Sequence, residues 1–148
     1  MSAHSYDIEV VSSAPIAKVF EVIADAPGWS RWNSFISRAS WEVEGHPAPW
    51  GVGAVRALGA GRGPLSRERI VAFDQPDHLA YVIVSGPIPV KDYRADVRLT
   101  TTEDGRTHIS WKGTWTTRVP FVSAYLTRTV CGFATGAARE AERLAGIV

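Results

Sequence analysis

The residues of this chain that could perform chemistry are one carboxylate and two phenols, all in strand-like sequence. Glu68 lies in the alternating run 65–73, and Tyr81 and Tyr93 lie in the two strand-like runs that follow. On a buried face, loss of water would raise the pKa of Glu68 and make it a possible general acid or base. The phenols could donate hydrogen bonds to a ligand carbonyl. Equally, Glu68 could be an exposed carboxylate paired with arginine, and the tyrosines could be ordinary core residues.

Tryptophans are the second group of side chains that could contact a ligand. The chain contains six Trp among 148 residues, which is enough to build a large apolar surface. Trp29 and Trp32 share a face at helical spacing, while Trp111 and Trp115 share a face at strand spacing around Gly113. These four side chains suit the wall of an apolar cavity, and plain core packing would explain them equally well. The sequence leaves both explanations open.

The sequence shows no motif typical of metal, nucleotide or nucleophile sites. The histidines at positions 4, 46, 78 and 108 have no ligand spacing, and Cys131 stands alone, so we predict no metal site. Residues 59–64 are rich in glycine, but a strand-like run follows them, whereas a phosphate loop precedes a helix. No dinucleotide fingerprint is present, so no cofactor is expected. We expect Cys131 to be a buried small apolar residue.

Length and composition predict a single domain, residues 1–148, of ordinary globular character. The net charge of +1 gives no electrostatic argument for binding nucleic acid. No apolar run reaches the ~20 residues of a transmembrane segment, and no signal-peptide pattern opens the chain. The single cysteine favours a reducing, cytoplasmic setting, and the preference for arginine over lysine favours a bacterial source. The sequence leaves the oligomeric state unknown.

Alternating apolar residues and turn signals predict mostly strands before the C-terminal segment. Pro15 is expected to open a first helix that ends at Pro27 and Gly28, and a short helical piece 29–36 follows. The predicted strands are 6–11, 37–44, 54–58, 65–73, 78–84, 93–100 and 109–115. Neither face of the 65–73 strand is cleanly apolar, so the direction of Glu68 stays undecided. Runs of strands followed by a helix indicate an α+β fold.

The longest helix is predicted after Pro120, which breaks the preceding strand. Apolar residues recur there at steps of three and four, so one stripe holds Val122, Leu126, Val130, Phe133, Ala137, Ala141 and Leu144. Gly132 and Gly136 lie beside the stripe, and each costs roughly 1 kcal/mol of helix stability relative to Ala. They indicate either close packing or room left for a ligand. Phe121 and Tyr125 lie off the centre of the stripe and are candidates for a cavity edge.

Two long segments resemble the SRPBCC or START-like superfamily, and its polyketide cyclase/dehydrase and lipid-transport-like branch looks closest. The first is SSAPIAKVFEVIADAPGWSRWNSFI, and the second is ERIVAFDQPDHLAYVIVSGPIPVKDYRADVRLTTTEDGRTHISWKGTW. With the terminal helix, the resemblance covers nearly the whole chain. It implies a helix-grip fold, in which a curved antiparallel sheet wraps around a long C-terminal helix and leaves a cavity between them. Its motifs describe packing and specify no reaction.

Three functions are compatible with these features. The first is a binding module that holds a small hydrophobic or aromatic molecule, lipid or polyketide-like, between the sheet and the terminal helix. The second, permitted by the resemblance, is a cyclase, aromatase or dehydratase that uses Glu68, Tyr81 or Tyr93. The third is an interaction protein similar to the chaperone-activating relatives of the superfamily, which predicts an exposed apolar patch on the sheet.

Overall fold

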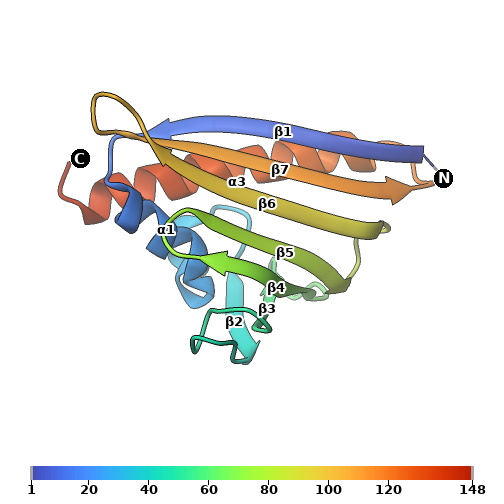
Figure 1. Cartoon of the computed structure of the whole chain (residues 1–148). Helices are drawn as coiled ribbons and strands as arrows, with labels where there is room; N and C mark the ends of the chain where they lie inside the picture. Colours follow the sequence, from blue (N-terminus) through green and yellow to red (C-terminus); the bar gives the residue numbers. More distant parts are fainter. Residues whose placement is uncertain (1, 148) are drawn as a thin grey trace.

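The computed structural model describes residues 2–147 as one antiparallel sheet with helices packed on one face (Figure 1). The strands are β1 Ser2–Ser12, β2 Arg38–Val43, β3 Val55–Gly59, β4 Ser66–Asp74, β5 His78–Ser85, β6 Lys91–Thr101 and β7 Thr107–Thr117. The helices are α1 Ile16–Ala24, the 3-10 turn η1 Ala26–Gly28, α2 Trp29–Trp32 and α3 Val122–Leu144. Among the described residues, no helix is long and apolar enough to cross a membrane.

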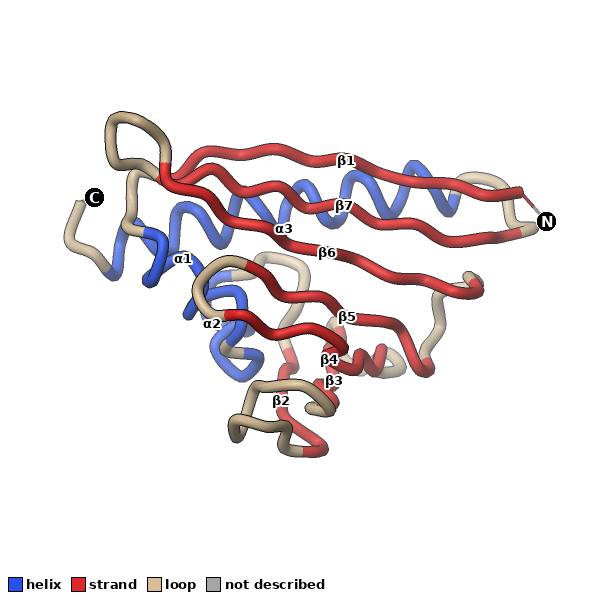
Figure 2. The backbone as a smooth tube through the Cα atoms, in the orientation of Figure 1, coloured by secondary structure: helices blue, strands red, loops and turns tan. Residues whose placement is uncertain are grey.

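The seven strands lie in the order β1-β7-β6-β5-β4-β3-β2, and every neighbouring pair is antiparallel. From β2 to β7 each strand therefore pairs with the next strand in the sequence. The first strand joins the last, and α1 and α2 carry the chain from β1 to the opposite edge. Figure 2 shows α3 running along β1 and β7 on the face that α1 also covers. This arrangement is the α+β helix-grip fold expected from the sequence.

The strand alternation places one face of the sheet against α3. In β6, the residues Tyr93, Ala95, Val97 and Leu99 are buried, while the residues between them are largely in contact with water. The apolar stripe of α3 packs on this face from Val122 to Ala141, and only Leu144 at its end is 45% exposed. Cys131 was expected to be buried, but it is exposed. Cys131 follows the buried Val130 by one residue, and one residue turns a helix by about 100°, so its side chain points away from the buried stripe.

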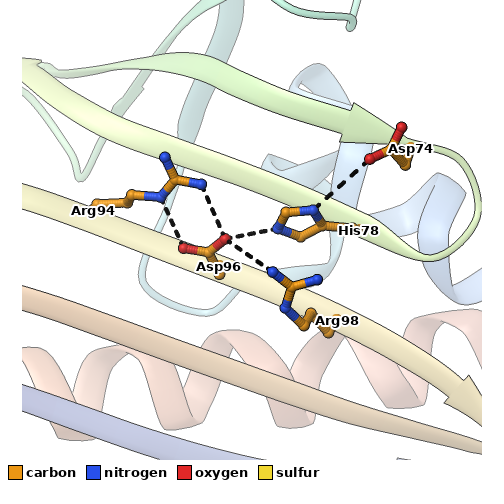
Figure 3. A network of polar contacts seen from close by, with 5 residues as sticks. All are labelled: Asp74, His78, Arg94, Asp96 and Arg98. Carbon is orange, nitrogen blue, oxygen red and sulfur yellow. Dashed lines mark hydrogen bonds and ion pairs between the residues drawn. The ribbon is translucent and has the colours of Figure 1, made fainter.

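A network of charged and polar side chains lies on the outward face of β6 and at the start of β5 (Figure 3). The Asp96 carboxylate accepts hydrogen bonds from Arg94 at 2.9 and 3.2 Å and lies 2.7 Å from Nε2 of His78. Arg98 and Asp74 extend this network at 3.8 and 3.9 Å. The hydrogen bond from Arg94 is the main reason why the pKa of Asp96 lies below its usual value. The sheet surface around Asp96 is therefore polar.

Helix boundaries differ from the sequence prediction at three points. Pro15 has extended backbone and precedes α1, and α3 begins two residues after Pro120. The predicted helix 29–36 is only one turn long, because the chain becomes extended at Asn33. The Oδ1 atom of Asn33 accepts hydrogen bonds from the backbone N–H groups of Phe35 and Ile36 at 2.8 and 3.0 Å. Such a bond satisfies the backbone without a helix.

The two glycines of α3 have different surroundings, and alanine substitution should separate them. A Cβ at Gly132 would meet no atom within 4 Å, so Gly132→Ala is expected to raise the free energy of unfolding by about 0.5–1 kcal/mol. A Cβ at Gly136 would lie 2.9 Å from Cζ3 of Trp32, so Gly136→Ala should stabilise less or destabilise. Urea denaturation of both variants tests this. Equal stabilisation would contradict close packing of Gly136 on Trp32.

Candidate functional site

A cavity of about 240 Å³ lies between the inner face of the sheet and α3. Its walls come from strands β3 to β6, from the loops before β2, after β3 and after β5, and from one side of α3. Most of the lining is apolar and includes Leu58, Ile83, Ile88, Leu126, Val130 and Phe133. The polar lining side chains are Ser66, Glu68, Tyr81, Tyr93, Tyr125 and Thr129. The cavity thus combines an apolar wall with a few hydrogen-bonding groups, as small-molecule sites commonly do.

Glu68 points inward and forms an ion pair that burial makes unusual. It is 8% exposed, and its Oε1 atom accepts a hydrogen bond from Nε of the fully buried Arg56 at 2.9 Å. Pairing of β3 with β4 sets Arg56 and Glu68 directly opposite each other, so both side chains leave the same face of the sheet. The second carboxylate oxygen, Oε2, accepts no hydrogen bond within residues 2–147.

The Arg56 guanidinium lies against two aromatic rings. Its Cζ atom lies 4.7 Å from the ring centre of Trp29 and 4.7 Å from that of Tyr81, and both separations permit cation–π attraction. Nη1 donates to the backbone carbonyl oxygen of Ile23 at 3.4 Å, while Nη2 has no hydrogen-bond partner among the described residues. Arg56 is therefore a buried cation supported mainly by one carboxylate and two rings.

Burial raises the pKa values of the carboxyl and phenol groups at this end of the cavity. Loss of water raises the pKa of Glu68, and attraction to Arg56 opposes that rise. Burial also raises the pKa of Tyr81 to about 12, and it raises those of Tyr93 and Tyr6 well above the usual value. All three phenols consequently stay neutral near pH 7.

The phenol hydroxyls of Tyr81 and Tyr93 form hydrogen bonds with side chains that lie outside the cavity lining. The Tyr81 hydroxyl accepts a hydrogen bond from Nε1 of Trp111 at 3.1 Å. The Tyr93 hydroxyl is hydrogen-bonded to the hydroxyl of Tyr6, which lies outside the cavity lining. Glu68, Tyr81 and Tyr93 thereby offer hydrogen-bond acceptors and donors to a ligand that reaches this end.

The structure brings together half of the residues that the sequence suggested for ligand contact. Glu68, Tyr81, Tyr93 and Tyr125 line the cavity. The other four candidates do not line it; Trp29, Trp111 and Trp115 are at most 2% exposed and pack in the core, and Trp32 packs on α3 at Gly136. Contact of any of the eight with a ligand stays a prediction.

Sequence reasoning missed Arg56 and Tyr6. An arginine in a strand is normally placed in water, and the predicted strand 6–11, which contains Tyr6, carries no motif for ligand contact. A signal for Arg56 was nevertheless present, because Ala54, Arg56 and Leu58 alternate on one face and both neighbours are apolar. In the structure those neighbours are buried, at 0% and 3% exposure. Within residues 2–147, no group of three His, Cys, Asp or Glu side chains is arranged to hold a metal ion.

Solved structures share this fold at low sequence identity. An aromatase/cyclase from Streptomyces sp. R1128 aligns with a TM-score of 0.81 and 20% identity, covering 96% of this chain and 95% of that chain. A protein from Nitrosospira multiformis aligns with a TM-score of 0.78 and 21% identity, covering 93% and 95%. Ara h 8.0201 aligns with a TM-score of 0.75 and 18% identity, covering 95% and 98%. At such identities these likenesses establish the fold.

Sequence comparison gives the family directly. A search of curated proteins found no match. The family model described as polyketide cyclase / dehydrase and lipid transport matches residues 3–145, nearly the whole chain. Fold and family are consistent with hydrophobic ligand binding or a polyketide cyclase-like function. This chain belongs to the polyketide cyclase / dehydrase and lipid transport family.

Proposed function

We propose that this protein binds a small, mainly apolar molecule, aromatic or lipid-like, in the cavity between the sheet and α3. The observation that carries the proposal is the cavity itself, whose apolar wall ends in Glu68, Tyr81 and Tyr93. An apolar ligand would gain from burial along the wall, while one oxygen or N–H group would hydrogen-bond at the polar end. Membership of a family that includes cyclases and lipid transport supports this ligand class.

The size of the cavity limits the part of a ligand that it can enclose. About 240 Å³ is smaller than the ~300–1,000 Å³ of typical small-molecule sites. A ligand is therefore either compact, such as a fused-ring phenol, or extends out of the mouth beside Tyr125. In both cases its leading end lies near Glu68.

Binding of 2-naphthol, measured by isothermal titration calorimetry, provides the direct test. Thr129 is half-buried and lines the cavity, so Thr129→Trp should fill the space and weaken binding at least tenfold. Thr127 is exposed on the same helix, so Thr127→Trp serves as the matched control and should bind like the wild type. Unchanged affinity in Thr129→Trp would place any bound naphthol elsewhere and contradict the proposal.

One observation favours an enzymatic function as a second candidate. Glu68 is a buried carboxylate at the cavity with a raised pKa, which suits a general acid or base better than an ordinary carboxylate does. In a cyclase-like reaction it would exchange a proton with a polyketide-like substrate. Tyr81 and Tyr93 would donate hydrogen bonds to its carbonyl oxygens.

Glu68→Gln is expected to abolish turnover of a poly-β-ketone substrate while its affinity stays within about threefold, because the amide keeps the shape but cannot transfer the proton. Product formation and calorimetry would be measured side by side. Glu42→Gln is the control, because Glu42 is exposed and pairs with Arg67 away from the cavity. Turnover that survives in Glu68→Gln removes Glu68 from the mechanism, and binding without turnover in the wild type leaves the first function.

A further inference from the structure

An apolar side chain in an unusual conformation lines a surface hollow beside the cavity, and this hollow shares Pro87, Ile88 and Tyr125 with the cavity lining. Phe121, immediately before α3, is 85% exposed, the highest value among the exposed large apolar side chains of the described residues. Its φ is +71°, in the left-handed region that bulky residues rarely adopt. The exposed ring contributes no burial energy to folding, and the left-handed backbone conformation costs stability. Such a combination indicates a role outside the folded chain itself.

Phe121 belongs to a continuous apolar surface, which we call the mouth patch: Phe35, Pro87, Ile88, Phe121 and Tyr125. Tyr125 follows Phe121 by one helical turn and is 44% exposed, and its ring packs on that of Phe35 at 6.3 Å. Pro87, Ile88 and Tyr125 line both the cavity and a shallow surface hollow beside Phe121. The loop after β5 is tied to the end of β7, since the Thr117 hydroxyl donates to the Pro89 carbonyl oxygen at 2.7 Å.

Four basic residues lie close in sequence or strand pairing to residues of the mouth patch or of the cavity lining. Arg118 precedes Phe121 by three residues, and Arg128 follows Tyr125 by three residues on the same side of α3. Lys91 in β6 lies opposite Thr116 of β7, two residues before Arg118. Arg62 adjoins Gly63, which lines the cavity. These four cations are exposed and form no ion pair within residues 2–147.

The charge of this region differs from that of the whole chain. Asp92 is the one carboxylate in the segments 60–65, 86–92 and 118–128, which contain the four cations. The chain as a whole has 16 basic and 15 acidic residues. An apolar surface flanked by cations without ion pairs among the described residues is complementary to a lipid surface, where acyl chains lie beneath anionic headgroups.

We propose that the mouth patch docks on a membrane surface bearing anionic headgroups, with Phe121 inserted among the acyl chains. Docking would bring the cavity mouth against the lipid, so an apolar ligand could enter or leave without crossing water. The docking itself does not depend on what the cavity holds.

Vesicle co-sedimentation at low salt tests the docking. Wild-type protein is expected to bind vesicles of phosphatidylcholine with phosphatidylglycerol, and binding should weaken at least tenfold on pure phosphatidylcholine or in high salt. Phe121→Gly removes the inserted ring and suits the left-handed conformation, so its melting temperature should equal or exceed that of the wild type while vesicle binding falls at least tenfold. Arg118→Glu with Lys91→Glu should lower binding to anionic vesicles only.

Ile147→Asp is the control for loss of exposed apolar surface, because Ile147 is 48% exposed and lies after α3, at the opposite end of that helix from Phe121. It should bind vesicles like the wild type. The proposal is overturned if the wild type ignores both kinds of vesicle, or if Phe121→Gly binds as well as the wild type. Concentration-dependent dimers in native mass spectrometry that Phe121→Gly abolishes, without vesicle binding, would assign the mouth patch to a second copy instead.

Discussion

Replacement of Arg56 by methionine is expected to lower the free energy of unfolding by about 3–5 kcal/mol, because the change leaves Glu68 as an unpaired carboxylate in the interior. Arg56 is fully buried and bonds Glu68 at 2.9 Å, so neither water nor another cation can take its place without rearrangement. The rings of Trp29 and Tyr81 also lose the cation between them. Urea denaturation of the wild type and the variant measures the difference.

Arg67→Met is the matched control, since it makes the same chemical change on the neighbouring strand. Arg67 pairs with Glu42 at 2.7 Å in contact with water, and such pairs contribute within about 1 kcal/mol. The double variant Arg56→Met with Glu68→Leu should recover much of the lost stability, because no buried charge remains. Similar losses in Arg56→Met and Arg67→Met would contradict the structural importance of the buried pair.

The loss in Arg56→Met should also depend on pH. Burial raises the pKa of Glu68 in the folded protein, and removal of Arg56 takes away the influence that opposes this rise. A carboxyl group whose pKa is higher in the folded than in the unfolded state stabilises the protein below the unfolded pKa and loses that contribution as the pH increases. The difference from the wild type should therefore be smallest at or below the ordinary value of 4.5 and grow as the pH rises above it. A loss that shrinks with rising pH would contradict this assignment.

Gly113→Ala is expected to destabilise the protein by about 1–3 kcal/mol, because there is no space for a methyl group on the inner face of β7. A Cβ at Gly113 would lie 2.5 Å from Cζ of Tyr6, the residue opposite it on β1. The Tyr6 ring would have to move, and its hydroxyl would lose the bond to Tyr93 at the cavity. Thermal and urea denaturation would both report the loss.

A double-mutant cycle with Tyr6→Leu isolates this contact. The smaller leucine side chain vacates the position of the ring, so Gly113→Ala in that background should be neutral or stabilising, since alanine restricts the unfolded chain more than glycine does. If Gly113→Ala costs the same in both backgrounds, the close approach of Tyr6 is not its cause.

The order and type of the elements were predictable because their signals are local. Alternation in β6 and the steps of three and four in α3 specify which side chains face the core before any partner is known. The family resemblance came from the same local patterns and added the curved sheet around the last helix. The helix boundaries were predicted less accurately, because they depend on side-chain hydrogen bonds that periodicity does not reveal. The Asn33 side chain, for example, accepts two backbone hydrogen bonds where α2 ends.

The direction of Glu68 was decided only by tertiary structure. In β4 an arginine lies on each side of Glu68 and neither face is cleanly apolar, so periodicity alone is ambiguous. The register of β3 against β4 places Arg56 opposite Glu68, and this neighbour, twelve residues earlier, makes burial of the carboxylate tolerable. Only the tertiary structure also decides which aromatic side chains line the cavity and which belong to the core, because this depends on how closely α3 approaches the sheet. Trp29 and Trp111 fill that space completely, whereas beside Tyr81 and Tyr93 the helix leaves a gap.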